Sequence, residues 1–304
     1  MVALPMWVMA TEDSSRKAVT RSIGLIEKSV SVYIEERSCF SCHHQALSVM
    51  ALGRAKLAGF TIQDNIVSAQ TKFTLEYFTN RKDRLPKGEG VPGGSYSAGY
   101  ALAGLTAAKE PANEISKALI QYLLKKQNKD GSWRIGTHRP PLEDSHFTAT
   151  ALGIKGIPEG THTQRASNWL KQAEAKSTED HTFKVLGLHW AKADPEKTAA
   201  AKTLLKLQCE DGGWAQLPKM KSDAYSTGQA LAALKQSGLL KAGSPQYKQG
   251  VAWLLKNQKA DGSWQVKTRS KPIQKYFESG FPHSKDQFIS ISATCWAVMA
   301  LLAK

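Results

Sequence analysis

The sequence predicts an all-α fold in which six helical hairpins close into a ring, an (α/α)6 toroid with one central cavity. Two observations predict it: a seven-residue turn that recurs along the chain, and helical stretches on both sides of each copy. The turn reads Q-x-x-D-G-(S/G)-W at residues 127–133, 208–214 and 258–264. Three matches to one seven-residue pattern indicate a structural repeat rather than chance.

Each copy of the turn follows a stretch with apolar residues at helical spacing. The Asp-Gly pair ends that helix, because glycine supplies the positive φ that a helix end or turn requires. We expect the tryptophan to pack between adjacent hairpins with its N–H near a turn carbonyl, and the glutamine to bond to the end of a neighbouring helix. A second helix, rich in Ala, Leu and Gly, is predicted after each turn at 148–155, 226–236 and 290–302.

The rest of the chain fits the same unit less closely. The second hairpin has a glycine-rich loop at 87–94, the fourth lacks the Gly-Trp turn, and the first has Cys39-Phe-Ser-Cys-His-His44 in its place. The predicted hairpins span roughly 20–60, 68–110, 114–156, 163–193, 196–238 and 246–303. Twelve helices in this arrangement form an inner and an outer barrel, so residues 16–304 are predicted to be one domain.

Residues 1–15 stand outside the repeat. Val8 and Ala10 fit the small-residue pattern before a signal-peptidase site, but the segment has no basic region and only a short apolar run. It is either the remnant of a signal peptide or a disordered apolar tail. No apolar run in the chain reaches the length of a membrane-spanning helix.

The 304-residue chain contains 41 Lys and Arg residues against 26 Asp and Glu, which gives a net charge of +15. This excess favours an acidic partner, such as a redox protein, a phosphorylated ligand or an anionic membrane surface, although a solvated basic surface explains it equally well. The basic residues are scattered over every repeat without interleaved aromatic residues, which argues against nucleic acid as a partner. The sequence leaves the oligomeric state open.

The recurring Q-x-x-x-G-x-W pattern resembles the QW repeat of squalene-hopene cyclases and their relatives. The resemblance implies the α/α toroid that terpene cyclases and prenyltransferase β-subunits use, and with it an enzyme that acts on an isoprenoid in the central cavity. The segment 264–290 and the Cys-x-x-Cys-His-His motif also resemble bacterial cyclase-like proteins of unassigned activity. A non-catalytic binding scaffold is a further alternative, because a fold does not fix a function.

The segment Cys39-Phe-Ser-Cys42-His43 matches the C-x-x-C-H motif of covalently attached c-type haem. Both thiols would add to the haem vinyl groups, and His43 would be the axial ligand of the iron. The main prediction is therefore a periplasmic or otherwise exported toroid that transfers electrons or senses a ligand; without haem we expect a cytoplasmic protein. The same cluster could instead bind zinc or form a redox dithiol. The candidate sixth ligands are His283, His146 and His138.

The Asp-x-Asp-Asp motif with which cyclases of this fold protonate a terpene is missing from the chain. Asp144, Asp223 and Asp286 precede second helices, at the rim where such acids lie in the family, and are the candidate catalytic residues. Each stands without a paired carboxylate that would raise its pKa. We favour helix N-capping for all three, worth about 1 kcal/mol each. Zinc-dependent prenyl transfer is disfavoured, because Ala224 and Tyr225 supply no thiol after Asp223.

Basic residues follow the last Gln-Trp turn. Lys267, Arg269 and Lys271, together with Tyr276, could bind an anion such as a diphosphate or a haem propionate, or could form a solvated charged run. With Tyr225, they make the predicted pocket for a small apolar or anionic ligand.

Overall fold

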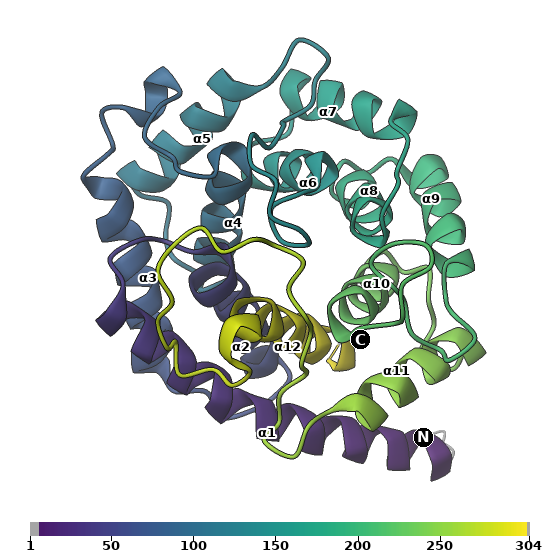
Figure 1. Ribbon diagram of the computed structural model, residues 1–304. Helices are drawn as coiled ribbons and strands as arrows, with labels where there is room; N and C mark the ends of the chain where they lie inside the picture. Colours follow the sequence, from purple (N-terminus) through teal and green to yellow (C-terminus); the bar gives the residue numbers. More distant parts are fainter. Residues whose placement is uncertain (1–5, 303–304) are drawn as a thin grey trace.

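The computed structural model describes residues 6–302 and shows twelve α-helices in that range, arranged as six hairpins in a closed ring (Figure 1). The predicted (α/α)6 toroid is confirmed. The outer helices are α1 (Met6–Glu36), α3 (Asp64–Thr79), α5 (Glu114–Lys126), α7 (Thr161–Gln172), α9 (Asp194–Lys206) and α11 (Pro245–Asn257). The inner helices are α2 (Leu47–Leu57), α4 (Gly94–Ala107), α6 (His146–Gly156), α8 (Thr178–Trp190), α10 (Ala224–Gln236) and α12 (Gln287–Leu301). Shorter helical turns lie at Cys42–Ala46, Leu85–Lys87 and Ser284–Asp286.

Burial distinguishes the two layers. The outer helix α5 buries one stripe, Ile115, Ala118, Leu119, Tyr122 and Leu123, at the spacing of a single helix face. The inner helix α12, in contrast, is buried at every residue from Ile289 to Leu301. The small residues predicted for the inner helices let their backbones approach closely: a Cβ on Gly228 would lie 2.7 Å from the backbone nitrogen of Ala297.

Each of the three Gln-Trp turns bonds to the first helix of the next hairpin. Trp133 is fully buried, and its Nε1 donates to the carbonyl of Leu123 at the end of α5 at 2.7 Å. Gln127 Nε2 donates to the carbonyl of Gly131 within the turn at 2.9 Å and to that of His162 in α7 at 2.8 Å. The same three bonds recur at 208–214 and 258–264, at 2.8 to 3.0 Å. The roles predicted for both residues are confirmed.

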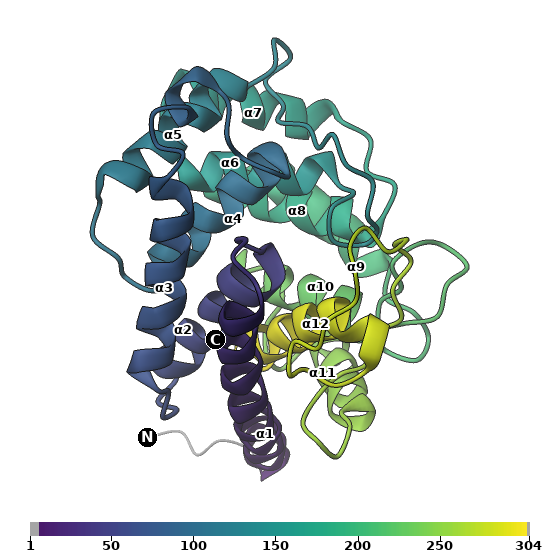
Figure 2. The same cartoon turned by 60° about the vertical axis from the view of Figure 1, so that its left-hand side comes forward.

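The last of these turns closes the ring. Gln258 Nε2 donates to the carbonyl of Ala18 in α1 at 2.9 Å, and Ser22 Oγ of α1 donates to the carbonyl of Gly262 at 2.7 Å. Gly262 has φ +89°, and a Cβ there would lie 2.5 Å from the carbonyl oxygen of Arg21. Helix α1 also packs against α2, α11 and α12, as Figure 2 shows. These two hydrogen bonds between the last turn and α1 therefore join the two ends of the chain.

The predicted tail of residues 1–15 is only partly covered. Residues 1–5 lie outside the described residues, α1 begins at Met6, and Ser15 is already buried. The signal-peptide interpretation stays a prediction. Within residues 6–302, none of the helices combines the length and apolar character needed to cross a membrane.

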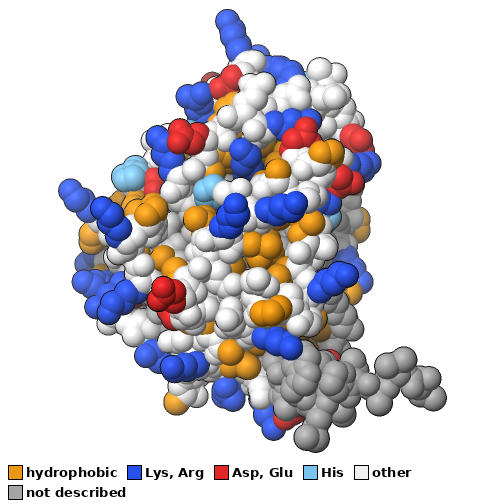
Figure 3. Space-filling view, turned by 90° about the vertical axis from the view of Figure 1, so that its right-hand side faces the viewer, with side chains coloured by type: hydrophobic (Ala, Val, Ile, Leu, Met, Phe, Trp, Pro, Cys, Tyr) orange, Lys and Arg blue, Asp and Glu red, His pale blue; other side chains and the backbone are white. Residues whose placement is uncertain are grey.

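The basic residues are spread over the surface. On the face in Figure 3, Lys and Arg side chains stand mostly singly among apolar and neutral side chains, with fewer acidic ones between them.

We expect Gln258→Ala to lower the free energy of unfolding by about 1–3 kcal/mol, because two buried or half-buried carbonyls then lose a donor at the ring closure. Urea denaturation measures the loss, and hydrogen exchange should be faster in α1 than in α5. Gln164→Ala, on the exposed side of α7, is the matched control. Equal effects of the two substitutions would contradict the closing role of Gln258.

Candidate functional site

The inner helices all run in the same direction, so their first turns meet at one end of the ring. Each presents a stripe of side chains to the axis. In α8 the stripe is Glu179, Phe183, Leu186 and Trp190, spaced four, three and four residues apart and therefore on one face. Phe183, Leu186 and Trp190 line a pocket in the middle of the ring, and Glu179 lies one turn away from them, toward the rim.

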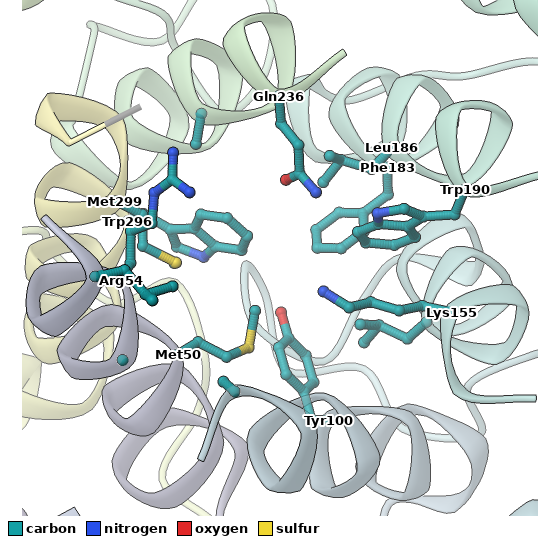
Figure 4. A pocket seen from close by; sticks show the side chains of 15 residues that line it. Met50, Arg54, Tyr100, Lys155, Phe183, Leu186, Trp190, Gln236, Trp296 and Met299 are labelled. Carbon is teal, nitrogen blue, oxygen red and sulfur yellow. The ribbon is translucent and has the colours of Figure 1, made fainter. Parts of the chain in front are cut away.

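This central pocket has a volume of about 270 Å³ and is lined by all six inner helices (Figure 4). Its wall is mainly apolar and aromatic, and Lys155 lies with its Nζ 4.7 Å from the centre of the Trp190 ring. The volume is near the lower end for small-molecule sites. The side chains that define it are Met50, Tyr100, Phe183, Trp190, Trp296 and Met299.

Glu179 is a buried carboxyl one helical turn from the residues that line the central pocket, and it is not itself part of that lining. Its side chain accepts hydrogen bonds from Thr148 Oγ1 at 2.7 Å and from the Tyr225 hydroxyl at 3.1 Å. Burial raises its pKa well above the ordinary value, and the carboxylates of Asp180 and Asp144 raise it further, whereas the two hydroxyl donors lower it. Burial is the largest of these effects, so the ring holds Glu179 in its protonated form to a higher pH than a solvated glutamate.

Polar groups without a protein partner surround this acid. The rings of Tyr96 and Tyr100 are 4.9 Å apart, and neither hydroxyl has a hydrogen-bond partner among residues 6–302. The same is true of the Trp296 indole nitrogen, which lines the central pocket. Buried polar groups are normally paired, so these three are positioned to meet a polar group of a ligand.

A polar recess of about 150 Å³ opens beside Glu179 at the end of the ring where the inner helices begin. Asp144, Asp180 and Tyr225 line it together with Arg269. The Arg269 Nε donates to Gln216 Oε1 at 2.7 Å, which fixes the guanidinium there. The recess brings together Tyr225 and Arg269, which the sequence predicts in one pocket. It adds Asp144 and Glu179, an acid that the sequence analysis does not single out.

A larger cavity of about 470 Å³, which we call the rim cavity, lies at the same end. Residues 268–276, part of the irregular segment 265–283, line this cavity. Figure 1 shows the segment passing in front of α2 and α4. One wall is apolar, from Tyr96, Leu142, Ile273, Phe288 and Ile289. The charged groups are one carboxylate, Glu143, and five cations: Arg139, Arg269, Lys271, Lys275 and Lys285.

Cys42 and His43 also line the rim cavity, but Cys39 does not. Cys42 Sγ is buried 3.7 Å from Ser97 Oγ, and burial raises the pKa of its thiol, so it is un-ionised. Cys39 Sγ lies instead 3.4 Å from the hydroxyl of Tyr33 in α1. Burial lowers the pKa of His43 to about 3. The motif therefore brings one thiol and one neutral imidazole into the cavity.

Of the three aspartates expected to cap helices, only Asp223 does so, accepting from the backbone of Ser226 at 3.0 Å. Burial raises the pKa of Asp223 to about 6. The capping prediction is wrong for Asp144, because the Ser145 hydroxyl caps α6 and Asp144 pairs with His138. It is also wrong for Asp286, whose carboxylate turns to the backbone N–H of Thr268 at 2.9 Å and holds the long loop.

The remaining predicted residues are dispersed. His283 Nε2 lies 2.7 Å from Ser263 Oγ in the last Gln-Trp turn and does not line the rim cavity, and His146 Nδ1 accepts from the backbone of Ile135 at 3.2 Å. Arg269, Lys271 and Tyr276 do line it, whereas Lys267 is exposed outside it. Within residues 6–302, no group of three or more His, Cys, Asp or Glu side chains is arranged to hold a metal ion, so zinc has no ligand set there.

Sequence reasoning missed Glu179. A signal for it was present, because Glu179, Phe183, Leu186 and Trp190 form the only charged-then-apolar stripe of the predicted hairpin 163–193. The fourth hairpin lacks the Gly-Trp turn, so the start of its second helix had no marker, and the expected family motif contains aspartate rather than glutamate.

Residues 178–304 match the family model described as the squalene-hopene cyclase C-terminal domain. Similar solved structures include variants of the type II terpene cyclase MstE from Scytonema. Its complexes with merosterolic acid A and with geranylgeranyl dihydroxybenzoate each share 14% identity with this chain, at TM-scores of 0.61 and 0.60, and cover 97% of this chain and 98% of theirs. A protein from Actinoplanes is 16% identical, with a TM-score of 0.57 and coverage of 94% and 98%.

No curated protein sequence matches the chain significantly. The fold of the whole chain is that of the terpene cyclases, and its C-terminal part carries the corresponding sequence signature. The chain is therefore an α/α toroid whose residues 178–304 resemble the squalene-hopene cyclase C-terminal domain.

The raised pKa of Glu179 predicts a pH dependence of stability. Above a pH of about 4.5 the unfolded chain releases this proton while the folded chain keeps it, so unfolding becomes easier as the pH rises toward the folded-state pKa. Glu179→Gln removes this dependence. We expect urea denaturation between pH 5 and pH 7 to show the wild type losing up to about 1.4 kcal/mol per pH unit relative to Glu179→Gln. Parallel curves for the two proteins would show that Glu179 is ionised in the fold.

Proposed function

We propose that the protein is an enzyme that cyclises an isoprenoid by protonating a carbon–carbon double bond, with Glu179 as the acid. The observation that carries the proposal is a buried carboxyl with a raised pKa, one helical turn from an aromatic pocket. General-acid catalysis needs a side chain that is still protonated when it reaches the substrate. Burial of a carboxyl meets this need, because it raises the pKa.

In the first step the Glu179 O–H bond breaks and a C–H bond forms at the terminal double bond of the substrate. The π electrons of that bond supply the new bond, which leaves a carbocation in the substrate and a carboxylate on Glu179. Thr148 and Tyr225 already donate toward the two carboxylate oxygens, so they stabilise the negative charge without rearrangement.

The wall of the central pocket suits the cation that results. Tyr100, Phe183, Trp190 and Trp296 present aromatic side chains around the axis, and aromatic faces attract cations by about 0.5–2 kcal/mol each. Ring closure then consumes further double bonds, and loss of a proton ends the reaction. The product is therefore an isomer of the substrate, with one hydrogen derived from the enzyme.

The comparisons support the substrate class. The solved structures of MstE contain geranylgeranyl dihydroxybenzoate as substrate and merosterolic acid A as product, and the matching family model is that of squalene-hopene cyclases. The aromatic wall and modest volume of the central pocket favour a small apolar ligand, such as a short isoprenoid chain. A non-catalytic scaffold is the alternative, and it predicts binding of such a ligand without turnover.

The haem-bearing electron carrier or sensor, and with it export to the periplasm, remains a separate proposal that concerns the rim cavity. Cys42 and His43 do not line the central pocket, although Arg269 lines both the rim cavity and the recess beside Glu179. A location in the cytoplasm follows only if haem is never attached.

We expect the wild type to convert at least one of farnesol, geranylgeraniol, squalene and geranylgeranyl dihydroxybenzoate into a cyclic isomer. In deuterium oxide, the product should carry one deuterium from the protonation step, which mass spectrometry detects. Glu179→Gln should lower the turnover by about 10²–10⁴-fold, because it removes the acid and keeps the shape of the side chain.

Glu174→Gln is the matched control, since Glu174 is exposed on the segment just before α8 and should keep wild-type turnover. Turnover by Glu179→Gln equal to that of the wild type would rule out Glu179 as the acid. Binding of the four compounds without any turnover by the wild type would favour the scaffold.

A further inference from the structure

The hydrogen bonds around the paired histidines fix where their protons lie. Ser29 Oγ donates to the carbonyl of Ser279 at 2.8 Å, so its contact with His44 Nε2 at 3.1 Å must be one in which the imidazole N–H donates. His44 therefore carries its proton on Nε2 and a lone pair on Nδ1. His44 is fully buried and stacks on Tyr33 at 4.5 Å, so this arrangement is held in place.

The position of the proton on His43 follows from the same hydrogen bonds. Its Nδ1 lies against His44 Nδ1, which has only a lone pair, so His43 must donate from Nδ1. Ser41 agrees, because its hydroxyl donates to Gln45 Oε1 at 3.0 Å and can only accept from His43 Nδ1, 3.4 Å away. The proton of His43 is thus on Nδ1, and its Nε2 carries a free lone pair.

This arrangement is the one that metal-binding histidines have. Such a histidine donates its other N–H to a second group, which fixes the tautomer and aims the lone pair at the metal. No protein group among residues 6–302 bonds to His43 Nε2, and His43 lines the rim cavity. The described residues contain no cluster of three metal-ligating side chains. If His43 binds a metal, the other ligands of that metal must therefore come from a cofactor.

The rim cavity has the other features of a porphyrin site. Its apolar wall of Tyr96, Leu142, Phe288 and Ile289 suits a flat hydrophobic ring, and its five cations face one carboxylate, Glu143, which Arg139 already pairs at 3.3 Å. The parallel inner helices add the positive ends of their dipoles at this rim. Two propionates of one haem would find cationic partners here.

We propose that the rim cavity holds a c-type haem whose iron is bound by His43 Nε2 and that is anchored by one thioether, to Cys42. Cys42 lines the cavity beside His43, whereas Cys39 lies with Tyr33 outside it. This proposal differs from the expectation of two thioethers, because a second thioether would require Cys39 to leave Tyr33.

The attachment is balanced without a further reactant. The Cys42 S–H bond and the π bond of one haem vinyl group break, the sulfur bonds to one vinyl carbon, and the hydrogen goes to the other. No oxidant or reductant is consumed. This site is independent of the proposed cyclase activity, because Glu179 and the central pocket take no part in it.

The test is expression of the full chain, targeted to the periplasm of a host that carries a cytochrome c maturation system, followed by visible spectroscopy of the purified protein. We expect a Soret band, about one haem per chain after denaturation, and a pyridine haemochrome spectrum that shows one intact vinyl group. Cys42→Ala should lower the retained haem at least tenfold. Cys39→Ala and Cys209→Ala, which alter thiols outside the cavity, should retain it.

His43→Ala should keep the covalent haem and change the spectrum of the iron, whereas His189→Ala at the far end of α8 should do neither. A host c-type cytochrome in the same cells shows that maturation worked, and circular dichroism shows that each variant is folded. With both controls satisfied, a wild type free of haem overturns the proposal. So does equal loss of haem in Cys39→Ala and Cys42→Ala. Glu179→Gln should keep the haem content of the wild type, so that a failure of the cyclase proposal can be distinguished from a failure of the haem proposal.

Discussion

The hydrogen bonds of the Gln-Trp turns are the constraint on which the rest of this structure depends. Each glutamine bonds at once to its own turn and to the next outer helix, and the last one bonds to α1. Three of the six hairpins are joined to the next in this way, and in all six an outer helix is followed by an inner helix, so the inner helices run in parallel. Their first turns therefore gather at one rim, and their later turns surround one pocket, so that the chemistry of the ring is polar at one end and apolar in the middle.

The polar groups at this rim explain how a glutamate can be buried there. Glu179 stands in the first turn of α8, where the helix dipole and two hydroxyl donors favour its charge, yet burial outweighs them and favours the proton. Burial favours the protonated form of this acid, and the hydroxyls of Thr148 and Tyr225 favour the carboxylate that it would leave. The rim cavity lies on the other side of Tyr96, so one ring offers two sites with different chemistry.

The fold was predictable because the Gln-Trp turn is local: seven residues contain the helix end, the positive-φ glycine and the tryptophan that fills the gap. The candidate site was less predictable, because it is assembled from residues of several hairpins. Arg269 and Tyr225 meet Asp144 only in the folded ring, and Glu179 has no motif of its own. Asp144 and Asp286 failed as caps because Ser145 and the loop at Thr268 offered competing partners that spacing along the chain does not reveal.

The central claim is that burial in the ring keeps Glu179 protonated to a higher pH than a solvated glutamate. Infrared spectroscopy of the folded protein at pH 7 tests it most directly, because a protonated carboxyl has a C=O stretching band that a carboxylate lacks. The account predicts such a band in the wild type, its loss in Glu179→Gln and its retention in Glu174→Gln. A wild type without the band, or a band that survives in Glu179→Gln, would contradict it.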